Sequence, residues 1–94
     1  MKVFLRFTPA LAKLTSCSEL ALEMEAENVT VGDLLLEIER KYPIVHETIA
    51  NDDQRLSSGI ICIINGEMLN SRELETRMVN DEDTVSFTVA IAGG

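Results

Sequence analysis

The sequence predicts one small α+β domain, a mixed sheet of about five strands with one main helix packed across it. Three observations predict this fold: alternating apolar residues near both ends of the chain, a capped amphipathic helix between them, and an apolar run followed by a hairpin signal. A chain of 94 residues has room for one hydrophobic core, and its 46% of hydrophobic residues is ordinary for a folded protein.

The first strand is predicted over residues 2–8. Val3, Leu5 and Phe7 alternate there with neighbours that face the opposite side, as expected for a half-buried strand. Pro9 ends the strand, because proline cannot continue the ladder.

A second strand follows where Leu20, Leu22 and Met24 alternate with glutamates. The short separation favours an antiparallel hairpin with the first strand. The connection over residues 9–18 is long enough to include a helical turn.

The clearest element is a helix that begins after Thr30. The Thr30 hydroxyl can cap a backbone N–H, and Asp33 three residues later completes a capping box. One helix face carries the apolar residues Val31, Leu35, Ile38 and Tyr42. Pro43 ends the helix, and Leu36 lies off this face, either covered by the next loop or part of a contact surface.

The middle of the chain, residues 44–59, is polar and rich in turn residues, with a short helical piece expected around Val45 to Ala50. Residues 60–64 are a continuous apolar run, and the predicted strand extends to Asn65. The run predicts a strand buried on both faces at the centre of a sheet.

Asn65-Gly66 is a strong hairpin signal, since a type I′ turn requires positive φ at both positions. Residues 67–70 then return as a short edge strand, and residues 71–76 are expected to form a single helical turn. The last strand contains the alternating residues Val85, Phe87, Val89 and Ile91.

This element order is the β-grasp (ubiquitin-like) plan, in which the first and last strands lie side by side and parallel at the sheet centre. We expect residues 1–91 to form the domain and residues 92–94 to form a flexible C-terminal Ala-Gly-Gly tail.

The charge of the chain restricts its partners. The formal net charge is −8, although residues 1–18 contain three bases and no acid. Such a surface repels nucleic acid and anionic membranes and favours basic partners. The longest apolar run is too short to cross a bilayer, so we expect a cytoplasmic protein.

A catalytic or metal centre is hard to assemble from these residues. His46 is the one histidine and is predicted to be an exposed loop residue, while Cys62 is expected to be a buried thiol and Cys17 a partly exposed one. Their spacing matches no zinc site. Asp81-Glu82-Asp83 is predicted to be a solvated turn, because it lacks the spaced ligands of a calcium loop.

What remains is the tail, Ala92-Gly93-Gly94. From the residues alone it is either a frayed terminus or a functional handle. A run almost without side chains can thread a narrow channel in which a Cβ would clash.

The motifs Thr30-Val31-Gly32-Asp33-Leu34-Leu35, Ile63-Ile64-Asn65-Gly66, Asp83-Thr84-Val85 and the final Ala92-Gly93-Gly94 resemble the ubiquitin-like sulfur-carrier family. The branch that is most similar is the small subunit of molybdopterin synthase. The thiamine-pathway carrier and the ubiquitin-related modifier that serves tRNA thiolation are relatives. The resemblance covers essentially the whole chain.

The resemblance implies a carrier protein that is not itself an enzyme and binds no cofactor. A ubiquitin-activating-like adenylyltransferase would consume ATP to adenylate Gly94, and a persulfide or sulfide would convert it into a thiocarboxylate. Gly93 and Ala92 would thread the tail into the acceptor, most simply the large subunit of molybdopterin synthase.

The resemblance also implies a partner-docking patch on the sheet, to which Phe4, Met68 and Thr88 would contribute. Family members often have glycine where this chain has Glu82, so that turn must differ or carry strain. Three alternatives stay open: a modifier that forms isopeptide bonds through Gly94, a carrier for tRNA thiolation or another pathway, and a β-grasp interaction module with an incidental tail.

Overall fold

The computed structural model describes residues 1–90, apart from the side chain of Ser71. The elements along the chain are β1 (Lys2–Phe7), α1 (Pro9–Thr15), β2 (Glu19–Glu23), β3 (Val29–Thr30), α2 (Val31–Lys41), α3 (Pro43–Ile49), β4 (Ile60–Ile64), β5 (Glu67–Met68), the 3-10 helix η1 (Ser71–Glu73), β6 (Met78–Val79) and β7 (Thr84–Val89). The predicted tail, residues 92–94, lies outside the described residues, as does Ile91.

Five strands form the main sheet in the order β2-β1-β7-β4-β5. The neighbours β1 and β7 are parallel, with Leu5 opposite Val85, and the other pairs are antiparallel. The predicted parallel pair at the sheet centre and the predicted hairpin between β1 and β2 are therefore both confirmed. The short strands β3 and β6, which the sequence did not predict, form a separate two-stranded sheet.

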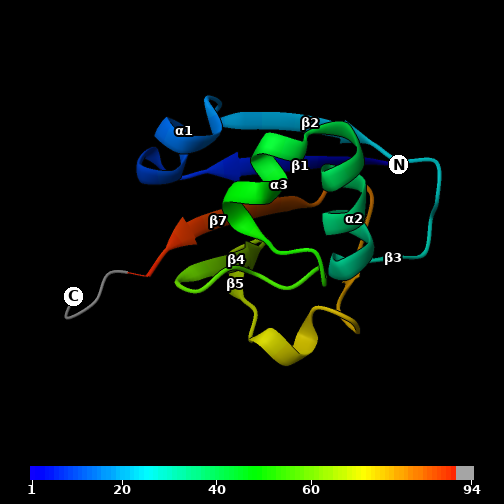
Figure 1. The fold of residues 1–94 in the computed structure, drawn as a ribbon. Helices are drawn as coiled ribbons and strands as arrows, with labels where there is room; N and C mark the ends of the chain where they lie inside the picture. The colour runs from blue at the N-terminus through cyan, green and yellow to red at the C-terminus, as the bar shows by residue number, and fades with distance from the viewer. Residues whose placement is uncertain (91–94) are drawn as a thin grey trace.

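The hydrophobic core lies between the main sheet and the helices. Figure 1 shows α1, α2 and α3 gathered on one side of the sheet. The inward residues of β1 (Val3, Leu5 and Phe7) are buried, as the alternation predicted. Phe7 stacks on Phe87, its partner in β7, with ring centroids 5.8 Å apart, which adds a side-chain contact to the parallel central pair.

The start of α2 has the predicted capping box. The Thr30 hydroxyl accepts from the Asp33 backbone N–H at 3.2 Å, and the Asp33 carboxylate accepts from the Thr30 N–H at 3.1 Å. Pro43 ends α2 and is also the first residue of α3, where its missing N–H is not needed. The short helix predicted around Val45 to Ala50 is thus confirmed as α3, which begins earlier, at Pro43. Leu36 is exposed rather than covered by a loop.

One prediction about the sheet is wrong. β4 lies between β7 and β5, but only one of its faces is buried, because no helix of the described part of the chain covers its outer face. Its inward residues Cys62 and Ile64 are fully buried, whereas Ile61 and Ile63 are half-buried on the outer face. A continuous apolar run does not reveal which of its two faces is covered.

Two turns bracket the start of β7. Asn65 and Gly66 have φ of 49° and 87°, as the predicted hairpin requires. In the second turn Glu82 has φ of 66°, which confirms the expected strain. The expectation of a fully solvated turn is wrong for Asp83, whose buried carboxylate accepts from Asn65 Nδ2 at 2.9 Å and from the Asn80 N–H at 2.8 Å.

Within residues 1–90, no helix combines the length and the apolar character that a membrane crossing requires.

Candidate functional site

The base of the predicted tail is held at one end of the sheet. β7 ends at Val89, and the next residue, Ala90, donates its N–H to the Gly59 carbonyl at 2.6 Å. Gly59 sits at φ of 83° in the turn before β4, a conformation that favours glycine. The chain is therefore fixed by the sheet up to Ala90. The predicted tail residues Ala92, Gly93 and Gly94 follow within four positions, outside the described residues.

We call the point at which the chain leaves the sheet, at Ala90, the exit. A second set of hydrogen bonds lies on the other side of it. Thr8, between β1 and α1, donates its N–H to the Phe87 carbonyl at 3.2 Å and its hydroxyl to Thr88 Oγ1 at 3.3 Å. The parallel pairing brings the end of β1 beside the end of β7, so the exit is framed by Thr8 on one side and Gly59 on the other. We call Thr8, Ser58, Gly59, Val89 and Ala90 the exit rim.

The three predicted docking residues lie on the outer face of the sheet, opposite the helices. Phe4 is 37% exposed and Met68 67%, while Thr88 is half-buried. These three residues do not form one continuous patch. Phe4 is level with Thr84 and Met68 with Ser86, so Phe4 and Thr88 are four residues apart along β7, about 13 Å.

Two residues of this face were missed by the sequence prediction. Ile63 lies between Met68 and Ser86, and Ile61 lies beside Thr88, so both add apolar surface to the outer face. The sequence predicts that both faces of this apolar strand are buried, so it does not identify Ile61 and Ile63 as surface residues. The β-grasp plan itself contained the needed signal, since its helix packs on only one face of the sheet.

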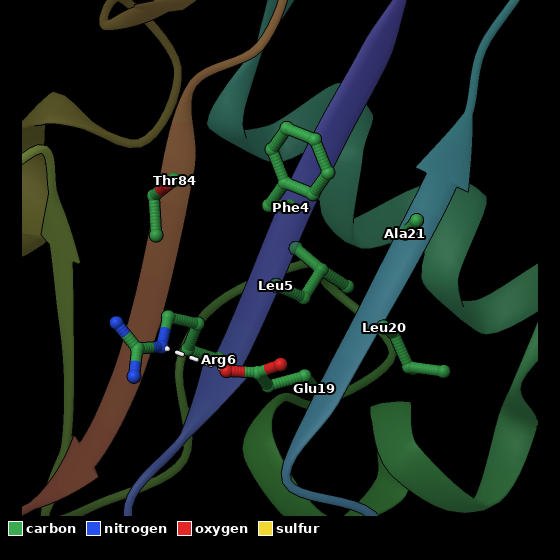
Figure 2. A pocket seen from close by; sticks show the side chains of 7 residues that line it. All are labelled: Phe4, Leu5, Arg6, Glu19, Leu20, Ala21 and Thr84. Carbon is green, nitrogen blue, oxygen red and sulfur yellow. Dashed lines mark ion pairs between the residues drawn. The ribbon is translucent and has the colours of Figure 1, made fainter.

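A shallow hollow lies on the outer face over β1 and β2 (Figure 2). The Phe4 ring stands at one end of it, and the Glu19 side chain extends from β2 across β1 toward Arg6, with Oε1 3.4 Å from Nε. Both charged side chains are largely exposed, so this pair adds little to stability and can rearrange against a partner.

The two thiols differ in burial. Burial raises the pKa of Cys62 to about 12, which keeps it a neutral thiol. Cys17 is partly exposed, as predicted. Among residues 1–90, no three His, Cys, Asp or Glu side chains come together to hold a metal ion.

The prediction that His46 is an exposed loop residue is wrong. It lies in α3 and is 3% exposed, with Nε2 2.8 Å from Gln54 Oε1 and Nδ1 3.5 Å from Glu39 Oε2. Gln54 Nε2 also donates to Glu39 Oε1 at 3.0 Å, which closes a ring of three side chains. This ring ties α2, α3 and the following loop together. The polar local sequence gave no sign of these partners, which come from other elements.

The sheet order, the parallel central strands and the capped helix across one face define a ubiquitin-like β-grasp protein. The model of the ThiS family matches residues 10–94, and the chain belongs to this family of ubiquitin-like sulfur carriers. Proteins of this kind are small carriers rather than catalysts, which agrees with the prediction that the chain is not an enzyme.

Solved structures share this fold. SAMP1 from Haloferax volcanii is 19% identical with 100% of both chains covered and a TM-score of 0.78. Small archaeal modifier protein 1 from Methanosarcina acetivorans is 27% identical over 99% of this chain and 96% of that chain, with a TM-score of 0.70. A putative molybdopterin converting factor, subunit 1, from Pyrococcus furiosus is 18% identical over 97% and 99%, with a TM-score of 0.71. No curated protein matched the chain.

Proposed function

We propose that the chain is a sulfur carrier whose Gly94 carboxyl group is activated with ATP and converted into a thiocarboxylate. The family match over residues 10–94 is the observation that supports this most strongly. The fixed exit at Ala90 supports it further, because it presents the following Ala92-Gly93-Gly94 from a defined point on the domain.

The chemistry requires two steps. In the first, a carboxylate oxygen of Gly94 attacks the α-phosphorus of ATP, the bond to the β-phosphate breaks, and pyrophosphate leaves. In the second, sulfide attacks the acyl-adenylate and AMP leaves, which yields the thiocarboxylate. A protein persulfide can replace sulfide if a thiol then cleaves the S–S bond of the acyl product. The carrier supplies the substrate carboxyl group and its partners supply the catalytic groups.

The tail residues suit this role. Gly93 and Ala92 add at most one methyl group of side chain, so the backbone can approach a confined active site closely. The outer face of the sheet, with Phe4 and Met68 exposed on it, would dock the activating enzyme, with Thr88 nearer the exit. We place these reactions in the cytoplasm, where ATP is available.

We propose the precursor of molybdopterin as the sulfur acceptor, with the large subunit of molybdopterin synthase as the enzyme that receives the tail. The residues Thr30 to Leu35, Ile63 to Gly66 and Ala92 to Gly94 that resemble the small subunit of that enzyme support this choice. Carriers for tRNA thiolation or another pathway would use the same activated Gly94.

A protein modifier is the second candidate. The 27% identity to small archaeal modifier protein 1 from Methanosarcina acetivorans favours it. In that case a lysine amine, rather than sulfide, would attack the activated Gly94 and form an isopeptide bond.

The test uses the full chain, the adenylyltransferase encoded in the same genome, and MgATP. The expected result is pyrophosphate release that requires Gly94 and is lost on its deletion. Partner binding and cellular phenotype that survive deletion of Gly93 and Gly94 would instead identify an interaction module with an incidental tail. Peptides in which a lysine side chain carries the C-terminal segment of this chain through Gly94 would support the modifier.

A further inference from the structure

The acidic residues of this chain are unevenly distributed in a way that the proposed function does not explain. The chain has 16 acidic residues, and none of them lies in residues 1–18, 54–66 or 84–94. These three segments contain the bases Lys2, Arg6, Lys13 and Arg55. The negative charge of the protein is therefore confined to the remaining segments.

The fold brings these acid-free segments together at the tail. They contribute β1, β4 and β7, and they meet at the exit rim through the bonds of Thr8 to Phe87 and of Ala90 to Gly59. Figure 1 shows the start of β1 and the loop that follows β2 at the opposite end of the sheet. That loop carries Glu25 and Glu27.

Burial alone does not account for the missing acids. Ser58 and Ala90 are exposed at the rim, and Lys13 and Arg55 are exposed in the same segments, so acids would be sterically tolerated there. The edge strand β2 does carry Glu19 toward this end, but Arg6 pairs with it.

The distance from the rim to the reacting carboxyl group is short. Four residues beyond Ala90 span at most about 14 Å even when fully extended, which is longer than the Debye length of about 8 Å at physiological salt but well within the length of about 30 Å at 0.01 M salt. At low salt, a charge on the rim would therefore act on the place where Gly94 reacts.

We propose that the exit rim faces a bound polyphosphate, the triphosphate of the ATP that activates Gly94, and that its lack of acids spares this anion from repulsion by a protein of net charge −8. This inference rests on the proposed function. It adds that the charge of the exit rim, and not the net charge of the carrier, determines how tightly the activating enzyme binds ATP while the carrier is bound.

The test measures the KM for MgATP in pyrophosphate release, with the activating enzyme of the same genome and saturating carrier. Ser58→Glu places an acid on the rim, and Ser58→Gln is its neutral control of similar size. Ala26→Glu adds the same charge in the loop after β2, an exposed position at the opposite end. Thermal unfolding of each variant checks that the fold is retained.

We expect Ser58→Glu to raise the KM for MgATP about threefold at low salt, with the effect shrinking at high salt. Ser58→Gln and Ala26→Glu should match the wild type. Equal KM values for Ser58→Glu and Ser58→Gln, or an equal rise with Ala26→Glu, would overturn the inference. A wild-type protein that releases no pyrophosphate would instead refute the proposed function, and the inference with it.

Discussion

Glu82 occupies a backbone conformation that suits glycine better than any other residue. Its φ of 66° lies in the left-handed region, where a side chain with a Cβ costs about 1–2 kcal/mol. The turn is nevertheless held in place, because the Glu82 N–H donates to the Lys2 carbonyl and Asp81 Oδ1 accepts from the Lys2 N–H at 2.7 Å. The surrounding bonds thus impose the strained conformation on this residue.

We predict that Glu82→Gly stabilises the protein by about 0.5–1 kcal/mol, the relief of strain minus the greater chain entropy of glycine in the unfolded state. The measurement is urea unfolding followed by circular dichroism. Glu82→Ala is the control, since it removes the same charge but keeps the Cβ. An equal gain from both variants would show that charge, and not backbone strain, limits this turn.

Cys62 provides a second test at the scale of a residue. Burial raises its pKa from the ordinary value of 9.0 to about 12, so above pH 9 the unfolded state loses this proton while the folded state keeps it. Stability from this group is therefore complete below pH 9 and is lost as the pH rises toward about 12.

Between pH 8 and pH 10, we expect the free energy of unfolding of the wild type to fall by about 1.4 kcal/mol more than that of Cys62→Val. Valine is of similar size and does not titrate. Urea unfolding at both pH values gives the comparison. Identical pH dependence in the two proteins would contradict the raised pKa.

At the scale of elements, α2 depends on its N-terminal cap. Its first turn is satisfied by the reciprocal bonds of Thr30 and Asp33, and its inward residues Leu34, Leu35 and Ile38 are fully buried. Loss of the cap leaves a backbone donor without its partner while the packing stays the same.

We predict that Thr30→Ala lowers the free energy of unfolding by about 1 kcal/mol, the usual effect of removing a threonine cap. Thr76→Ala is the matched control, because Thr76 is exposed and outside any helix. Chemical denaturation measures both. A Thr30→Ala variant as stable as the control would mean that packing alone determines where α2 begins.

The same helix shows why part of the fold could be predicted from the sequence. A capping residue, an apolar periodicity and a terminating proline all lie within residues 30–43, so local signals were sufficient. The Asn65-Gly66 hairpin and the alternation of β1 and β7 are local in the same sense. Together they determined the order of the elements, and the order determined the sheet.

The features that could not be predicted from the sequence depend mostly on contacts between elements that are distant in the chain. The burial of His46 depends on Glu39 and Gln54, which belong to another helix and to a loop. The outer exposure of Ile61 and Ile63 depends on where the helices lie, which no local pattern reports. Strands of two residues, such as β3, carry too little periodicity to be detected.

At the scale of the whole molecule, the sheet has one face covered by helices and one that is open. We predict that Phe4→Ser and Met68→Ser each raise the KM of the carrier for its activating enzyme at least about tenfold, as expected for exposed apolar residues central to an interface. Steady-state pyrophosphate release provides the measurement.

Leu36→Ser and Ile44→Ser serve as controls for this prediction. Leu36 is 54% exposed and Ile44 69%, but both lie on helices rather than on the open face. If these variants impair activation as much as Phe4→Ser does, the docking surface is on the helical side, and the proposed role of the open face is wrong.

The central claim concerns Gly94 itself, and intact-mass analysis after incubation with the activating enzyme, MgATP and sulfide tests it most directly. We predict a mass gain that corresponds to replacement of one oxygen by sulfur, located on the C-terminal peptide and absent when Gly94 is deleted. An unchanged mass in the wild type, with an activating enzyme shown to adenylate another carrier, would contradict the claim that this protein carries sulfur.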